Sequence, residues 1–215
     1  MTNHEAVLPL FSPLVNQAEH KRYHTIVADP PWKYDKAGGY SWRKGLPSGE
    51  TRPMTPYPTM TSEEIAQMPI GLWAQTDAHL YLWSTQRYLR PSLSIAESWG
   101  FEVRKVLLWC KAPTGFSMGG AYGNSTEFII LGVRGQLPFL NRTPRDWFDW
   151  KRGEHSEKPA AFYDLVEHMS PGPYLDVFAR KQRFNWDTFG NESFDFREHG
   201  IWHREPVKEG LSSSE

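Results

Sequence analysis

The sequence predicts an α/β fold in which a mainly parallel β-sheet carries helices on both faces. Short apolar runs that are typical of strands alternate along the chain with segments that have helical signals. Several of these runs are apolar throughout, and such strands are usually buried on both faces of a sheet. No internal repeat is visible, and a length of 215 residues suits one domain of this class.

The strands are assigned to short segments that are rich in apolar, β-branched and aromatic residues. In chain order, they cover residues 23–28, 78–84, 101–109, 127–133 and 174–178, and residues 184–190 form a further extended segment. The first strand runs into Pro30 and Pro31, which can continue neither a helix nor a ladder of strand hydrogen bonds. We therefore expect a rigid loop at the carboxyl end of this strand.

Three helices are expected between the strands. The first begins at a cap formed by Thr61 or Ser62, because two glutamates follow in its first turn. The second covers residues 88–99 and ends at Gly100. The third covers residues 158–169 and has a proline in its first turn, a position that proline favours.

One domain is expected over residues 23–193, between an N-terminal arm at 1–22 and a polar C-terminal tail at 194–215. Three long segments inside this domain have the composition of loops, and long loops in compact domains are often functional. They cover residues 33–58, 111–125 and 134–157, and the first and third of them are basic.

The composition narrows the classes of function. A net charge of −1 is unusual for a protein that binds nucleic acid mainly through phosphate contacts, so affinity must come from local patches, base stacking or a partner chain. A single cysteine, Cys110, excludes an internal disulfide and a cysteine-rich zinc site, and the histidines lack metal-ligand spacing, so no metal is expected. We find no signal peptide and no membrane span, and expect a location in the cytoplasm or another reducing compartment.

Asp29, Pro30, Pro31 and Trp32 combine the groups that methylation of an aromatic amine requires. The lone pair of such an amine is delocalised into its ring, and hydrogen bonds from both amine protons to acceptors free it. A carboxylate is one strong acceptor, and a carbonyl held by proline is another. The aromatic ring can stack on the base. The alternative is a plain turn after a strand, since both dipeptides are common in turns.

Seven blocks in the chain resemble the MT-A70 family of adenine methyltransferases in order and spacing, from about Tyr23 to Glu192. They are ADPPWKY at 28–34, YPTMTSEEI at 57–65, LYLWST at 80–85, SWGFEVRKVLLWCK at 98–111, EHSEKPAAFYDLVEHMSPG at 154–172, LDVFAR at 175–180 and NWDTFGNE at 185–192. The resemblance implies a class I, Rossmann-like methyltransferase of permuted motif order, with the catalytic half first and the cofactor-binding strand late. It also implies S-adenosylmethionine as the cofactor.

The resemblance assigns roles to individual residues. Asp29 and the carbonyl of Pro30 would hold the target amine, and Asp29 would also attract the positive charges of the cofactor. Trp32 and Tyr57 would line the adenine pocket. The remaining cofactor contacts would come from Ser156, Lys158, Phe178, Arg180, Asn191 and Glu192, and further substrate contacts from Lys33, Tyr122 and Asn124. The Gly-rich segment at 115–127 departs from the pattern of many relatives, and Tyr122 and Asn124 would stand in for the residues found there.

Three functions remain in competition. The compact size resembles the bacterial and phage branch and favours adenine in DNA as the target, whereas RNA adenosine is the alternative with the same chemistry. A non-catalytic subunit is a third hypothesis, although Asp29, Lys158, Asn191 and Glu192 are all retained. Methylation of cytosine is disfavoured, because such enzymes usually have serine in place of Asp29. A homodimer or a partner subunit fits the near-neutral charge.

Overall fold

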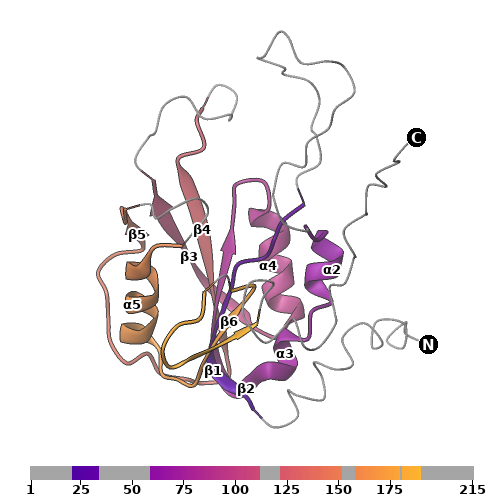
Figure 1. The fold of residues 1–215 in the computed structure, drawn as a ribbon, viewed down its shortest axis with the longest axis vertical. Helices are drawn as coiled ribbons and strands as arrows, with labels where there is room; N and C mark the ends of the chain where they lie inside the picture. Colours follow the sequence, from indigo (N-terminus) through magenta and orange to yellow (C-terminus); the bar gives the residue numbers. More distant parts are fainter. Residues whose placement is uncertain (1–20, 34–58, 112–121, 152–157, 180, 190–215) are drawn as a thin grey trace, which may run out of the picture.

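The structure, a computed structural model, describes residues 21–33, 59–111, 122–151, 158–179 and 181–189. Figure 1 shows one twisted sheet with helices packed beside it. The strands are β1 (Tyr23–Ala28), β2 (Ala74–Ser84), β3 (Glu102–Cys110), β4 (Thr126–Arg134), β5 (Trp147–Phe148), β6 (Tyr174–Val177) and β7 (Trp186–Phe189). The helices are α2 (Ser62–Ala66), α3 (Ile70–Trp73), α4 (Leu89–Ser98) and α5 (Ala160–Met169).

The sheet has the strand order β5-β3-β4-β2-β1-β6-β7. Four of its pairings are parallel: β1 with β2, β1 with β6, β6 with β7, and β3 with β5. Only β4 is antiparallel to its neighbours, β2 and β3. Because β3 and β4 are adjacent in the chain as well as in the sheet, the chain returns directly, and a direct return gives an antiparallel pair. The expected mainly parallel sheet is confirmed.

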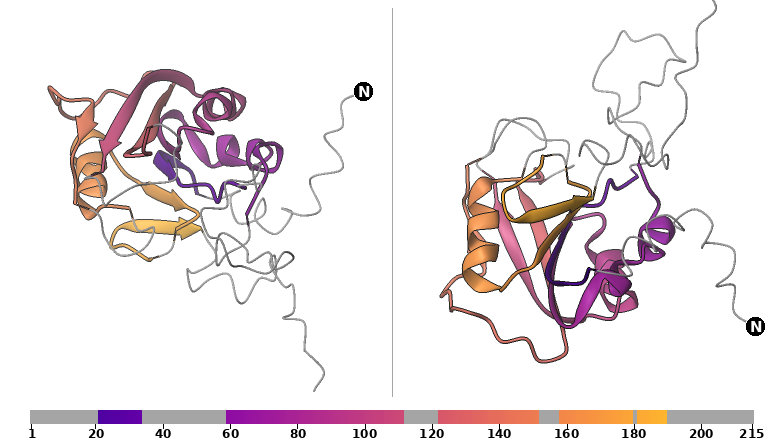
Figure 2. Two further views of the ribbon diagram at one scale, coloured as in Figure 1. Left: turned by 90° about the horizontal axis from the view of Figure 1, so that it is seen from above. Right: turned by 60° about the horizontal axis from the view of Figure 1, so that its bottom comes forward.

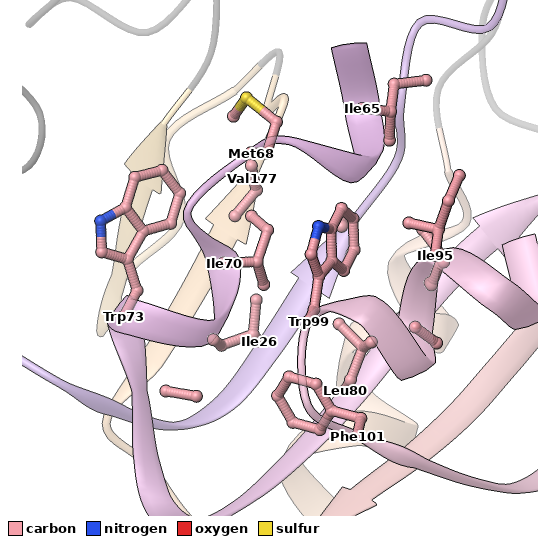
Figure 3. Packing of buried hydrophobic residues seen from close by; sticks show 14 of the residues in the cluster. Ile26, Ile65, Met68, Ile70, Trp73, Leu80, Ile95, Trp99, Phe101 and Val177 are labelled. Carbon is pink, nitrogen blue, oxygen red and sulfur yellow. The ribbon is translucent and has the colours of Figure 1, made fainter. Parts of the chain in front are cut away.

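Helices cover both faces of the sheet, as expected. On one face, Ile26 and Leu80 pack beneath residues of α3 and of the end of α4, among them Ile70 and Trp99 (Figure 3). On the other face, the neighbouring residue Val27 belongs to the cluster that includes α5 (Figure 2). Successive side chains of a strand point to opposite faces, so the apolar residues at the end of β1, Ile26, Val27 and Ala28, contribute to both cores.

Local signals placed the helix ends well. Thr61 caps α2 through a capping box, in which its Oγ1 accepts from the Glu64 amide at 3.2 Å and the Glu64 carboxylate accepts from the Thr61 amide at 2.7 Å. The chain leaves α4 through Gly100, whose φ of +86° suits glycine. Pro159 precedes α5 as its cap residue, rather than lying within its first turn as expected.

Three elements differ from the sequence-based expectation. The short helix α3 was not expected, β5 lies inside the segment 134–157, which was expected to be loop, and β2 begins at Ala74 rather than at residue 78. β5 is too short for its own pattern to identify it; it pairs with β3 at Leu108 and Trp109. The pairing is a tertiary contact, so the local sequence contains little trace of it. Within the described residues, no helix is long and apolar enough to cross a membrane.

The topology brings several chain segments to one edge of the sheet. β1, β2, β3, β6 and β7 end at this edge and β4 begins there, as the parallel and antiparallel registers require. We call it the carboxyl edge. From β1 the chain continues to β2 on one side, whereas β6 joins later on the other side. Ligands of α/β sheets bind outside the carboxyl ends of the strands where the strand order reverses in this way.

Candidate active site

The Asp29–Trp32 segment leaves β1 at the carboxyl edge and is held by backbone hydrogen bonds. The Asp29 amide donates to the carbonyl of Val177 in β6 at 3.3 Å, and the Trp32 amide donates to the carbonyl of Pro30 at 2.9 Å. Met60 holds the other side, donating to the Pro31 carbonyl at 2.8 Å. These hydrogen bonds fix the backbone conformation of the turn, although each proline lacks a backbone N–H donor.

Trp32 is part of the core in this structure. Its side chain is 5% exposed and stacks on Tyr88, with the ring centroids 4.7 Å apart and the planes 15° from parallel. The hydroxyl of Tyr88 also donates to the carbonyl of Lys33. One face of the Trp32 ring is therefore occupied by Tyr88. A nucleobase could contact only the remaining exposed surface of this ring unless Tyr88 moves away.

A network of four charged side chains, alternating in sign, lies at the carboxyl edge beside Asp29; we call it the charge network. The Lys158 ammonium contacts Asp29 Oδ1 and Glu127 Oε2, both at 3.0 Å. The other carboxylate oxygen of Glu127 accepts from Lys111. The four groups come from the ends of β1 and β3, the start of β4 and the residue before Pro159. Their side chains are largely covered, with 14% of Lys158, 23% of Asp29 and 17% of Glu127 exposed.

The side chains of the charge network stabilise one another in their ionised forms. Burial acts to raise the pKa of Glu127, but attraction to Lys158 and then Lys111 outweighs it and leaves the pKa below its usual value. Burial likewise acts to lower the pKa of Lys158, and the carboxylates of Asp29 and Glu127 reverse this effect, so that the pKa of Lys158 is raised. Lys158 and Glu127 are therefore both charged at neutral pH.

Two tryptophans form the floor beneath the two ammonium groups. Lys158 Nζ lies 4.4 Å from the centre of the Trp83 ring, and Lys111 Nζ lies 5.3 Å from that of Trp109. The two indoles pack edge to face and are both buried. Desolvated contacts of this kind favour a cation over the ring face. The ammonium groups are thus bounded by rings on one side and by carboxylates on another.

Phe178 has strained backbone at the end of β6. Its φ is +68°, in the left-handed region that bulky residues avoid, and its amide donates to the carbonyl of Phe189. Such strain costs about 1–3 kcal/mol and concentrates at functional sites. Phe178 is adjacent to the Asp29 turn, because the residue before it, Val177, accepts the hydrogen bond from the Asp29 amide.

Asp176 is a buried acid in β6 close to this site. Its Oδ2 accepts a hydrogen bond from the Tyr163 hydroxyl at 2.8 Å, and Arg183 lies over the Tyr163 ring at 3.8 Å. Burial raises the pKa of Asp176 to about 7, the Tyr163 hydrogen bond opposes this, and repulsion from Asp29 adds to it. Asp176 therefore titrates near neutral pH.

The raised pKa of Asp176 predicts a stability that falls as pH rises. Ionising this group costs more in the folded than in the unfolded chain, so stability is lost from the unfolded pKa, near 3.8, up to the folded pKa of about 7. Between pH 5 and pH 7, the free energy of unfolding of the wild type should fall by about 2–3 kcal/mol relative to Asp176→Asn. Asparagine can still accept from Tyr163. Urea unfolding at several pH values measures this difference, and a difference that is constant with pH would contradict the assignment.

The model of the MT-A70 family matches residues 23–192 of this sequence. The chain belongs to the MT-A70 family. Among its relatives, the type II methyltransferase M.MunI of Mycoplasma sp is 31% identical over 188 residues, which cover 82% of this chain and 80% of that protein. The catalytic subunit METTL3 of Homo sapiens, an N(6)-adenosine-methyltransferase, is 26% identical over 182 residues, which cover 80% of this chain but 28% of that protein. The METTL3 subunit of Danio rerio matches over the same shares.

Membership of the MT-A70 family confirms the expected fold and the expected class of enzyme, a methyltransferase. The sheet order agrees with permuted motifs, since β1 carries the Asp29 turn early in the chain while β6 and β7 follow late on its other side. The roles of individual residues in this MT-A70 chain remain predictions, to which the structure adds positions.

The structure brings some of the predicted site residues together at the carboxyl edge. Asp29, Lys158 and Phe178 lie around the ends of β1 and β6. Tyr122 and Asn124 are exposed just before β4, at the same edge, with 86% of Tyr122 accessible. Lys33 is exposed after the turn. Five predicted site residues lie outside the described residues: Tyr57, Ser156, Arg180, Asn191 and Glu192.

Sequence reasoning did not assign roles to Glu127, Lys111, Trp83 or Asp176 in this MT-A70 chain. A signal existed for three of them, because each is a charged residue at the end of, or inside, an otherwise apolar strand segment: Lys111 follows β3, Glu127 lies near the start of β4 and Asp176 interrupts β6. Such a residue needs a partner when it is buried. The sequence does not say which partner, because the partners lie on different strands.

The side chains at this edge fit S-adenosylmethionine better than a metal ion. A carboxylate at Asp29 suits a cationic ligand, and the Lys158 ammonium, which has three N–H donors, suits a carboxylate. Within the described parts of the chain, no group of three histidine, cysteine, aspartate or glutamate residues is arranged to hold a metal.

Proposed function

We propose that this protein transfers a methyl group from S-adenosylmethionine to the 6-amino group of adenine in DNA. The observation that carries the proposal is the position of Asp29. This residue directly follows β1 in the Asp29–Trp32 turn, and its carboxylate contacts the Lys158 ammonium at 3.0 Å. The relatives support the choice of substrate. M.MunI, which is matched along 80% of its own length, is named a type II methyltransferase, and the METTL3 proteins are named for N(6)-adenosine.

In this proposal, Asp29 accepts a hydrogen bond from the target amine and Pro30 accepts a second one. The carbonyl of Pro30 already accepts from the Trp32 amide at 2.9 Å, and a carbonyl oxygen has two lone pairs, so one acceptor position remains in a fixed direction. Two acceptors draw the nitrogen toward a tetrahedral shape and free its lone pair. Asp29 does not need to remove a full proton before transfer, and the extra proton leaves the nitrogen afterwards.

S-adenosylmethionine, when bound, supplies an electrophilic methyl group. Asp29 would face its positive charge and Lys158 its carboxylate, and Ser156, Phe178, Arg180, Asn191 and Glu192 would complete the contacts. Catalysis then depends mainly on alignment and electrostatics rather than on a strong base. In duplex DNA the base must leave the stack before it can reach Asp29. Tyr57, Lys33, Tyr122 and Asn124 are the proposed contacts to the nucleic acid.

A second chain is part of the proposal. Net charge of −1 leaves little general attraction to phosphates, so a second copy or a partner subunit would supply part of the nucleic-acid surface. The METTL3 relatives are named as subunits, which agrees with an assembly. A cytoplasmic location stays a prediction from the sequence.

The test is a methylation assay with radiolabelled S-adenosylmethionine and four substrates of mixed sequence: duplex and single-stranded DNA, and duplex and single-stranded RNA. Digestion of the products identifies the methylated nucleoside. Label in 6-methyladenine from DNA is the expected result. Label only in RNA would transfer the function to adenosine in RNA, and label in methylcytosine would overturn the assignment of the base. No label and no binding of S-adenosylmethionine by calorimetry would favour the non-catalytic subunit.

A further inference from the structure

We propose that Glu127 is a positioning residue that holds the Lys158 ammonium against the Asp29 carboxylate. The inference rests on the proposed function, because it assigns Glu127 a role in the same site. Glu127 acts through Lys158, whose ammonium its Oε2 contacts. Its position on β4, a strand paired on both sides, makes it a rigid anchor for a flexible lysine.

Glu127 uses both of its carboxylate oxygens. Oε2 accepts from Lys158 at 3.0 Å, and Oε1 accepts from Lys111. Lys111 follows β3, and its amide donates to the carbonyl of Ser125 at 2.7 Å, which ties the end of one strand to the start of the next. The carboxylate is therefore fixed in position and direction by two cations and by the sheet beneath it.

Lys158 requires such an anchor because its side chain is long and has many rotamers. The ring of Trp83, 4.4 Å away, limits it on one side, and the carboxylates of Glu127 and Asp29 lie within 3.0 Å. Asp29 alone could attract the ammonium without defining its position. With Glu127 as a second fixed acceptor, the ammonium lies between two defined points, and the contact with Oδ1 restricts the rotation of the Asp29 carboxylate.

Lys111 completes the charge balance. Asp29 and Glu127 are two negative charges around the Lys158 ammonium, and Lys111 supplies a second positive charge. The charge network of these four side chains is therefore neutral. The carboxylates that raise the pKa of Lys158 are those of Asp29 and Glu127. Asp176 in β6 is a further acid near this site, and the charge of Lys158 acts to lower its pKa.

The test is Glu127→Gln. An amide has one acceptor oxygen, whereas Glu127 serves two ammonium groups, so at least one of them would face an N–H donor in the variant. Misplacing a catalytic group by about 1 Å can cost 100-fold in rate, so we expect kcat to fall by about 10- to 100-fold. The affinity for S-adenosylmethionine, measured by calorimetry, should fall by a smaller factor than kcat, because Lys158 keeps its charge and its contact with Asp29.

The pH dependence gives a measurement that a merely structural role would not change. In the wild type, the two carboxylates keep the pKa of Lys158 above its usual value. Losing the charge of Glu127 should move the titration of Lys158 to lower pH. NMR of the lysine ε-carbons follows this in the protein alone, and the alkaline limb of kcat should move in the same direction.

Glu102→Gln is the matched control, because Glu102 is an exposed carboxylate on β3 that pairs with Arg104. It should leave kcat and both titrations unchanged. Glu127→Asp keeps the charge but shortens the side chain; if Glu127→Gln does not fold, Glu127→Asp should lower kcat while keeping the wild-type alkaline limb. Normal kcat and an unmoved titration in the folded variants would overturn the positioning role. An inactive wild type would instead overturn the proposed function.

Discussion

Replacing Asp29 by asparagine is expected to abolish methyl transfer almost completely while leaving the protein folded. The variant keeps the shape of the side chain but loses the charge that strengthens the hydrogen bond to the amine and that faces the cofactor. Loss of such preorganised electrostatic stabilisation lowers kcat by roughly 100- to 1,000-fold. Lys158 retains Glu127 as a partner at 3.0 Å, so the rest of the charge network keeps its contacts.

Single-turnover kinetics and calorimetry separate the two effects of Asp29→Asn. The rate of label transfer to DNA should fall by the factor given above, while S-adenosylmethionine binds with an affinity close to that of the wild type. Asp164→Asn is the matched control, since Asp164 is exposed on α5 on the far side of that helix from its buried residues. A variant that turns over at a near-normal rate would remove Asp29 from the mechanism.

Replacing Lys158 by methionine is expected to damage both activity and stability. The change leaves the carboxylates of Asp29 and Glu127 without the ammonium that lies between them. Removing one partner of a buried ion pair costs about 3–5 kcal/mol, because the remaining charge is buried without compensation. For a chain of this size, the melting temperature should fall by roughly 6–20 °C. The affinity for S-adenosylmethionine should fall by about 10-fold or more, as a charge-assisted hydrogen bond is lost.

The loss of stability in Lys158→Met should depend on pH. Burial acts to raise the pKa of Glu127, and without Lys158 this effect meets less opposition. Glu127 would then bind a proton more readily in the folded variant than in the wild type. Lowering the pH toward 5 should therefore reduce the difference in unfolding free energy between the two proteins. Denaturant unfolding at pH 5 and pH 8 measures it; a difference that grows at low pH would contradict the ion-pair explanation.

The turn that follows β1 and the ends of the helices were predictable because their causes are local. Two prolines end β1 whatever the rest of the chain does, Thr61 finds its capping partner three residues away, and Gly100 supplies the positive φ on which α4 ends. The antiparallel direction of β4, the short β5 and the short helix α3 were not expected. The direction of β4 depends on its return beside β3, and β5 is a strand only through its pairing with β3.

The sequence by itself determined the α/β class and the family to which the chain belongs, and it predicted a chemistry for Asp29 and its prolines. These follow from residues that are close together or that occur in a fixed order. Only the tertiary structure decided that Lys158 lies between Asp29 and Glu127, that Lys111 balances their charge and that Tyr88 covers Trp32. These partners come from different strands and loops. Their side chains meet only after the folded sheet has brought the ends of these strands to one edge.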